Sequence, residues 1–205
     1  MSQPEPIYLP SPSQKGGMPL AKAIAKRRSI RDFTPEPISQ SQLSQILWAT
    51  QGISDSSWKS RTIPSAGATY PLEIFVVCGR NGIEEIDDSV YHYDINNHSL
   101  TLHHRGDVRL ELARAALNQE SIYQAPVDIV ICAEYERTLM RYGSRGERYV
   151  HMEVGHAGQN IYLQAAALGL ATVAIGAFHD EQVREVLRLD ESYKPLYIMP
   201  IGKPA

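Results

Sequence analysis

Three arginines and a serine crowd into positions 27–31 of this 205-residue chain, as Arg27-Arg28-Ser29-Ile30-Arg31. Each guanidinium is permanently charged and presents paired N–H donors that match phosphate or carboxylate oxygens. Three such charges repel one another unless an anion lies among them. The cluster follows an amphipathic segment and precedes the breaker Pro35-Glu36-Pro37. Two interpretations follow: a binding site for a phosphorylated small molecule, or a solvated basic turn.

The composition excludes several classes of protein. The formal net charge of -3 gives no bulk attraction to nucleic acid or to an anionic membrane. No apolar run approaches the roughly 20 residues of a membrane span, and the N-terminus shows no secretory signal pattern. Cys78 and Cys132 lie in apolar runs, where we expect small buried side chains in a reducing compartment. We therefore expect a cytoplasmic protein without nucleic-acid or membrane partners.

The elements that must position the basic cluster follow a proline-rich arm. Residues 1–19 hold five prolines and are expected to be extended, either disordered or lying along a partner subunit. The helices are expected at 20–30, from the cap Ser39 to the stop Gly52, at 108–117, at 147–168, and at 181–188 with Asp180 as cap. The strands are expected at 73–78, 127–133, 170–175 and 197–201, with a hairpin of 90–94 and 99–102 around Asn96-Asn97. Residues 53–63, with Trp58 as a lid or interface aromatic, are expected to form a loop. Interleaved helices and strands favour an α+β or α/β fold.

Four segments carry a resemblance to a known family. They are 27–33, the turn Pro64-Ser65-Ala66-Gly67 with its continuation to Glu73, Glu153 to Asn160, and Gly169 to Phe178. In this order and spacing the chain resembles the FMN-dependent nitroreductases, and among them the SagB-type (azoline-oxidase-like) dehydrogenases. The resemblance implies an α+β three-layer α-β-α sandwich, with helices flanking a mostly antiparallel sheet, in a domain of residues 20–205. It also implies a homodimer with FMN at the subunit interface.

The resemblance assigns roles to the basic cluster. Arg27 and Ser29 are expected to contact the FMN phosphate and ribityl oxygens, with help from Arg28. Arg31 is expected at the pyrimidine edge of the flavin, where a fixed cation favours the reduced, anionic ring. The alternative for Arg31 is a surface ion pair with Asp32 or Glu36.

Other site residues come from the same resemblance. The Pro64, Ser65, Ala66 and Gly67 loop is expected to face the isoalloxazine of the neighbouring subunit, and the alternative is a plain strand-entry loop. Tyr70 is expected either to flank the substrate cavity or to pack beneath that loop. A backbone N–H at Gly176 or Ala177 is expected near flavin N5, and the alternative is a strand-to-helix turn. The Gln119 amide is expected at the pyrimidine edge, and Lys203 is expected either near the phosphate or in a frayed tail.

The small residues of helix 147–168 are expected to form the dimer core, with Gln159 and Asn160 as interior hydrogen-bonding residues. His151 and His156 lack zinc-pair spacing, the four histidines of the hairpin are expected at the surface, and no metal is expected.

The expected chemistry is FMN-dependent oxidoreduction, in which NAD(P)H drives ping-pong reduction of a nitroaromatic or quinone. One alternative is a pathway dehydrogenase that oxidises a peptide-derived, azoline-like substrate with FMN and oxygen. Azoline oxidases of the subgroup have a Lys-Tyr pair before the long helix, where this chain has Arg141-Tyr142. Arginine does not deprotonate near neutral pH and cannot act as that base. Another alternative is a flavin-binding protein without turnover.

Overall fold

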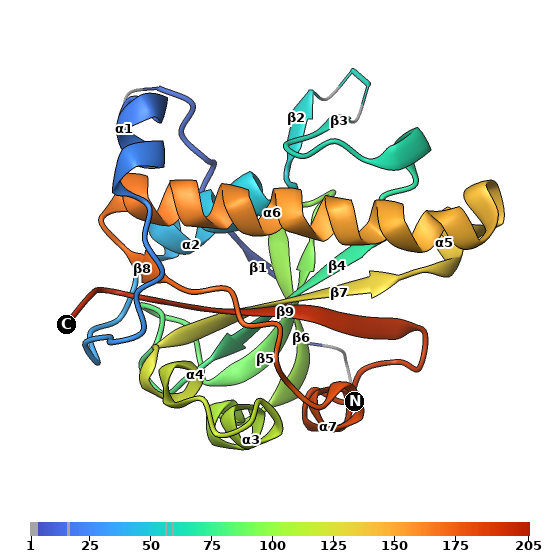
Figure 1. Cartoon of the computed structure of the whole chain (residues 1–205). Coiled ribbons are helices and arrows are strands. Elements are labelled where there is room, and N and C mark those ends of the chain that lie inside the picture. The colour runs from blue at the N-terminus through green and yellow to red at the C-terminus, as the bar shows by residue number, and fades with distance from the viewer. Residues whose placement is uncertain (1–3, 16, 56, 59) are drawn as a thin grey trace.

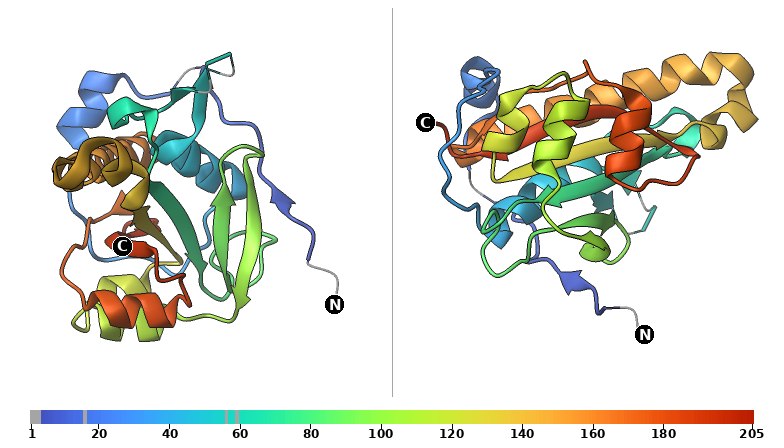
Figure 2. Two further views of the ribbon diagram at one scale, coloured as in Figure 1. Left: turned by 90° about the vertical axis from the view of Figure 1, so that its right-hand side faces the viewer. Right: turned by 90° about the horizontal axis from the view of Figure 1, so that it is seen from below.

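The computed structural model describes residues 4–15, 17–55, 57–58 and 60–205. Its centre is a seven-stranded sheet with the order β1-β6-β5-β4-β7-β9-β8 (Figure 1). Every pair of neighbouring strands in this sheet is antiparallel. Helices α1, α2 and α6 lie on one face, and α3, α4 and α7 lie on the other (Figures 1 and 2). The predicted α+β three-layer sandwich is confirmed.

The sheet contains β1 (Ile7–Tyr8), β4 (Leu72–Cys78), β5 (Ser89–Asp94), β6 (Ser99–Arg105), β7 (Val127–Glu134), β8 (Ala171–Thr172) and β9 (Tyr193–Gly202). A separate ribbon pairs β2 (Ile53–Asp55) with β3 (Ser60–Arg61). The helices are α1 (Leu20–Lys26), α2 (Gln40–Gln51), α3 (Arg109–Ala115), α4 (Glu120–Gln124), α5 (Glu136–Tyr142), α6 (Gly146–Leu168) and α7 (Asp180–Val186). Short 3-10 turns occupy η1 (Ala66–Ala68) and η2 (Gly143–Arg145). None of the helices in the described ranges is both long and apolar enough to cross a bilayer.

The central strand β4 serves two hydrophobic cores. Ile74 and Val76 pack in the core shared with α2 and α6, and Phe75 and Val77 pack in the core shared with α3 and α7. Because successive side chains of a strand point to opposite faces, a continuous apolar run is needed where both faces are covered. This explains why the run from Ile74 to Cys78 is apolar at every position.

Helix α6 is the longest element and has one face without a covering. Its buried face contributes Val150, Val154 and Ile161 to the core. On the opposite face Met152 is 53% exposed, and a Cβ added to Gly155 would meet nothing within 4 Å. A long stripe of α6 is therefore available for contact with a second molecule.

The residues that begin and end α2 agree with the prediction, but other helix boundaries do not. Ser39 forms a complete capping box with Gln42 and Gly52 ends α2, as predicted. The helix expected over 20–30 ends at Lys26, because the backbone beyond it turns to pair with β8 instead: Ile30 N–H donates to Thr172 O at 3.0 Å.

Three further expectations are corrected. The loop expected at 53–63 contains the β2–β3 ribbon, whose strands are too short to show a periodic pattern. The strand expected over 170–175 stops at Thr172, and beyond it a single bridge joins Ile175 to Ile198. Asp180 is the first residue of α7, and His179 occupies the cap position.

The described part of the N-terminal arm lies against its own chain. Ile7 pairs with Leu100 at the sheet edge, and Leu9 is buried in the main core. The Pro10 carbonyl accepts a hydrogen bond from Ser44 Oγ at 2.5 Å. Contacts with distant segments of the same chain thus hold the described part of the arm. The domain boundary expected at residue 19 stays a prediction.

Candidate functional site

The basic cluster forms a strap over the ends of β8 and β9. After the Ile30 bond to β8, Phe33 bridges Pro204 and packs against Ala125 and Ala171. The tail of the chain is held on the same strap, because Thr34 N–H donates to Lys203 O at 3.0 Å. The frayed-tail alternative for Lys203 is therefore wrong.

Tyr162 of α6 anchors this strap. The Arg27 guanidinium lies 5.1 Å from the centre of the Tyr162 ring. The Tyr162 hydroxyl accepts the Ala174 N–H at 2.8 Å and shares a 2.8 Å hydrogen bond with Ser29 Oγ. One phenol thus joins the basic cluster to the segment after β8. Sequence reasoning missed this residue, because Tyr162 and Ser29 are 133 positions apart and no local pattern links them.

Of the other basic residues, Arg28 and Lys203 make contacts within the protein, and Arg31 is exposed to solvent. Arg28 donates to the carbonyls of Ala25 and Arg27 at 2.9 and 2.8 Å and so caps α1. Lys203 Nζ pairs with Glu36 Oε2 at 2.5 Å. Arg31 is exposed, and no ion pair joins it to another described residue, so neither Asp32 nor Glu36 neutralises it. The strap therefore keeps Arg31 open to an external anion.

The segment after β8 carries the two positions expected near flavin N5. Gly176 and Ala177 are exposed, and the Ala177 carbonyl accepts a hydrogen bond from Gln119 Nε2 at 3.0 Å. A Cβ added to Gly176 would lie 3.6 Å from the ring of Tyr197. Arg27, Ser29, Gly176, Ala177 and Gln119 are thus linked into one surface through Tyr162 and Ala174.

The loop Pro64–Gly67 lies at a different place. It docks on α5, where Arg141 Nη1 donates to Gly67 O at 2.9 Å. Beneath the loop lies Glu153, which precedes Tyr162 by nine positions on α6. At 1.5 Å of rise per residue the two side chains are separated by about 13 Å along the helix axis. One chain therefore does not bring this loop and the basic strap together.

The side chains of Arg141 and Tyr142 pack against the loop at Gly67. Gly67 has φ of 59°, and a Cβ there would lie 2.5 Å from the Tyr142 hydroxyl and 3.0 Å from Arg141 Cδ. A residue with a Cβ would be strained at this φ and would force the Tyr142 and Arg141 side chains to shift. A second contact joins Thr69 to Thr138 at 2.8 Å. The Arg141 guanidinium is thus engaged with the loop backbone.

Glu153 is the ionisable residue beneath the loop. Its side chain is buried, at 3% exposure, and burial raises its pKa to about 7. The hydroxyl of Ser65, the charge of Arg61 and the amide of Gln51 oppose this shift without cancelling it. A carboxyl with this pKa changes charge near neutral pH.

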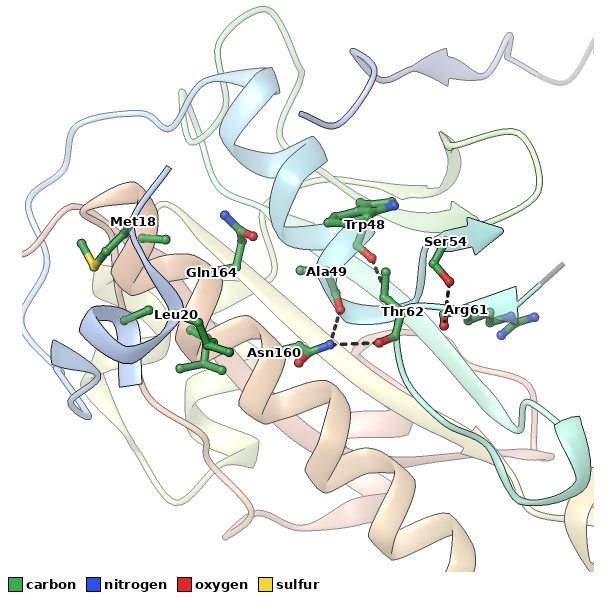
Figure 3. Close-up of a pocket in the computed structure, with 12 residues that line it drawn as sticks. Met18, Leu20, Trp48, Ala49, Ser54, Arg61, Thr62, Asn160 and Gln164 are labelled. Atoms are coloured by element: carbon green, nitrogen blue, oxygen red, sulfur yellow. Dashed lines mark hydrogen bonds between the residues drawn. The ribbon is translucent and has the colours of Figure 1, made fainter. Parts of the chain in front are cut away.

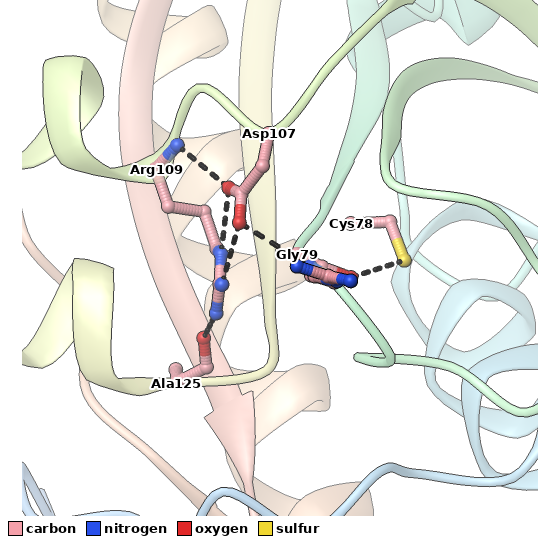
Figure 4. Close-up of polar contacts among 6 residues, drawn as sticks. Cys78, Gly79, Asp107, Arg109 and Ala125 are labelled. Carbon is pink, nitrogen blue, oxygen red and sulfur yellow. Dashed lines mark hydrogen bonds and ion pairs between the residues drawn. The ribbon is translucent and has the colours of Figure 1, made fainter.

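Figure 4 shows a forked ion pair between Arg109 and Asp107 next to Ala125. Arg109 binds the Asp107 carboxylate through Nε at 2.9 Å and Nη2 at 2.7 Å. Its Nη1 donates to the carbonyl of Ala125, the residue against which Phe33 packs. The same guanidinium would collide with any Cβ at Gly79. The pair therefore fixes the surface on which the strap lies.

A cavity of about 450 Å³ opens between α1, α2, the β2–β3 ribbon and α6 (Figure 3). Its wall is mostly apolar and includes Leu20 and Trp48, with Arg61 at one end. Asn160 lines it and donates through Nδ2 to the carbonyls of Ala49 and Thr62 at 2.9 and 3.4 Å. The cavity is large enough for a small aromatic molecule.

Several expectations about polar residues are corrected. Asn160 does bond in the interior, but Gln159 is exposed, because adjacent helical positions point about 100° apart. Of the hairpin histidines expected at the surface, His104 is buried, and His92 bonds Glu73 at 2.6 Å. Cys78 and Cys132 are both unpaired and buried, as predicted.

Comparison with known proteins gives the family. The nitroreductase family model matches residues 24–203. The Methanocaldococcus jannaschii protein "Putative nitroreductase MJ1384" is 46% identical over 184 residues, which cover 90% of each chain. A crystal structure from Ralstonia eutropha JMP134 superposes with a TM-score of 0.86 at 30% identity, covering 98% of this chain and 90% of that chain.

The names of more distant relatives fall into two groups. The Escherichia coli "Microcin B17-processing protein McbC" is 28% identical over 69% of this chain, which spans 54% of that protein. Relatives at 26–27% identity have the names of flavin reductases and an NADPH nitroreductase, and the chain spans about two thirds of their length. The SagB-type resemblance is thus confirmed alongside that to reductases. By sequence and fold, the chain is an oxidoreductase that belongs to the nitroreductase family.

Proposed function

We propose that this protein is an FMN-dependent oxidoreductase that uses NAD(P)H to reduce an electron-poor acceptor such as a nitroaromatic or quinone. The observation that carries the proposal is the surface around Tyr162. Its hydrogen bonds join the basic strap to Ala174, two residues before the exposed backbone of Gly176. Relatives named as flavin reductases support the choice of FMN and NAD(P)H.

The residues of this surface suit FMN. Arg27 and Ser29 offer a charge and a hydroxyl for the phosphate. Arg31, which forms no ion pair within the described ranges, offers a guanidinium for the pyrimidine edge. Gly176 leaves the backbone accessible, and the Gln119 amide is already fixed by Ala177. When bound, FMN supplies hydride transfer, and the chain supplies binding and electrostatics.

A homodimer completes the proposed site. The Pro64–Gly67 loop of one chain lies apart from its own strap, and the face of α6 around Gly155 is open. Packing a second copy on this face brings the loop of that copy toward the strap. The site residues therefore come from two chains: the strap, Gln119, Gly176 and Ala177 from one, and the loop from the other. We also propose a cytoplasmic location, which the two unpaired cysteines support.

The relation to McbC favours a second candidate, oxidation of a peptide-derived substrate with FMN and oxygen. The contact between Arg141 and Gly67 argues against a proton-transfer role at that position. We therefore rank reduction first.

The test is spectroscopic. Purified protein is expected to be yellow, and anaerobic NADH or NADPH is expected to bleach it. A yellow protein that neither nicotinamide bleaches favours the oxidation candidate. A colourless protein that cannot be reconstituted with FMN contradicts both candidates.

A further inference from the structure

A group of buried polar side chains lies beneath the 64–67 loop, separated along α6 from Tyr162. Glu153 and Gln51 are 3% and 0% exposed. Among the described residues, no well-aligned hydrogen bond reaches Glu153 Oε1, either end of the Gln51 amide, or Arg61 Nη1. Buried polar atoms without partners cost free energy, so their presence under a functional loop calls for an explanation.

Ser65 connects this group to the loop. Its Oγ accepts the Tyr70 N–H at 2.9 Å, which leaves the hydroxyl proton available to the Glu153 carboxyl beside it. Ser65 is one of the four loop residues expected to face the flavin. A change of charge on Glu153 therefore acts directly on the turn that shapes the loop.

Arg61 is the nearest cation, but it is engaged elsewhere. Its guanidinium lies 4.2 Å from the centre of the Tyr70 ring, and no ion pair joins it to Glu153 in the described chain. This arrangement suits a neutral carboxyl, because an ionised one would attract the guanidinium. Arg61 also lines two cavities of about 450 and 420 Å³, so its movement alters the space on both sides of it.

The remaining charges around the group are already paired. Beyond Arg61 lie Glu73 of β4 and Arg137 of α5, which bind each other at 2.6 Å. Glu73 also binds His92, and Arg137 donates to the Tyr70 carbonyl at 3.1 Å. Helix α2 contributes only the neutral amide of Gln51. Arg61 is therefore the cation that responds when Glu153 ionises.

We propose that Glu153 is a positioning residue that holds the 64–67 loop ready for FMN while its carboxyl is neutral. On ionising, Glu153 draws Arg61 away from the Tyr70 ring and pulls the Ser65 hydroxyl toward its carboxylate. This pull strains the hydrogen bond between Ser65 Oγ and the Tyr70 N–H and distorts the loop. The inference rests on the proposed function, because the loop matters for binding only if it meets FMN. Its consequence is that FMN binds best to the protonated protein and more weakly as the pH rises through neutrality.

The experiment measures the dissociation constant of FMN, by flavin fluorescence, for the wild type and Glu153→Gln. The measurements run from about pH 6 to about pH 8.5, which spans a carboxyl pKa near 7. The FMN phosphate titrates in this range too, but its effect cancels in the ratio of the two constants. We expect the wild-type constant to match that of Glu153→Gln at the acid end and to exceed it increasingly at the alkaline end. For each unit by which bound FMN raises the Glu153 pKa, the ratio of the two dissociation constants at the alkaline end increases about tenfold.

The matched control is Glu185→Gln on the exposed side of α7, which is expected to keep the wild-type pH dependence. A ratio that stays constant across the range overturns the inference while leaving the proposed function intact. Failure of every variant to bind FMN at any pH contradicts the proposed function instead. If Glu153→Gln does not fold, carbon-13 NMR of the wild-type Glu153 carboxyl decides. A pKa that FMN does not raise overturns the inference.

Discussion

The hydroxyl of Tyr162 gives a sharp test of how the basic strap is held. Tyr162→Phe keeps the ring beneath Arg27 and removes the hydrogen bonds to Ser29 Oγ and the Ala174 N–H, both 2.8 Å long. Each such bond contributes about 0.5–1.5 kcal/mol net. Ser29 is exposed and Ala174 is partly buried, so water replaces part of what is lost. We therefore expect Tyr162→Phe to lower the free energy of unfolding by about 1–2 kcal/mol.

The assay is urea unfolding at one protein concentration, for the wild type, Tyr162→Phe, Ser29→Ala and the double variant. If the two hydroxyls bond each other, the losses of stability in Tyr162→Phe and Ser29→Ala do not sum to the loss in the double variant. The expected coupling energy is about 1 kcal/mol. FMN affinity of Tyr162→Phe is expected to fall as well, because Ser29 loses its anchor. Tyr123→Phe, at a tyrosine that is 51% exposed on α4, is the control and is expected to change stability by less than about 0.5 kcal/mol. Additivity within about 0.3 kcal/mol would refute the role given to Tyr162.

Four further outcomes are expected. Arg27→Ala weakens FMN binding roughly 10- to 150-fold, the equivalent of one charge-assisted bond, and affects riboflavin much less; equal losses in titrations of both flavins contradict a phosphate contact. Arg31→Ala lowers the two-electron potential of bound FMN, by about 30 mV for each 1.4 kcal/mol, and an unchanged potential in a redox titration removes Arg31 from the pyrimidine edge. Gly67→Ala lowers the free energy of unfolding by at least about 1–2 kcal/mol, because the φ of 59° at Gly67 is left-handed. If urea unfolding gives this variant the same stability as the wild type, the loop adapts to the added Cβ without strain. For Glu153→Gln, the native carboxyl of the wild type has its pKa raised from 4.5 to about 7 by burial. The free energy of unfolding of the wild type therefore declines as the pH rises from 4.5 to about 7. Above that range the variant is more stable by at most about 3.4 kcal/mol. Parallel curves of stability against pH for the wild type and this variant would show that the native pKa of Glu153 is normal.

Features that depend on neighbouring residues could be predicted from the sequence, and features that depend on distant contacts could not. Ser39 and Gly52 delimit α2 through cap chemistry that spans four residues at each end. Helix α4 was missed because five residues are too few to show a helical period. Helix α5 was missed because it buries only Thr138 and so has no apolar stripe in its sequence. The boundary at Lys26 was missed because the backbone after it bonds to Thr172, far away in the chain.

The same division applies to the site. A dense run of arginines is visible in the sequence, and the structure places it on an accessible strap. The roles of Tyr162 and Glu153 depend on contacts with Ser29 and Ser65, residues of distant segments. Glu153 lay within a segment that identified the family, yet only the fold shows that it is buried beneath the loop. Burial, which sequence pattern alone does not reveal, determines its pKa.

The strap and the loop of the proposed site lie at different positions along α6, which explains why a twofold dimer would complete the site. Tyr162 holds the strap toward one end of the helix, and Glu153 lies under the loop about 13 Å nearer the other end. A twofold axis across the open face near Gly155 would set two copies of α6 side by side in opposite directions. The loop end of each helix would then lie toward the strap end of its partner, and the same contact would be made twice. A flavin bound there would sense the charge of a carboxyl in the other chain, so the pH dependence expected for Glu153 would act between subunits.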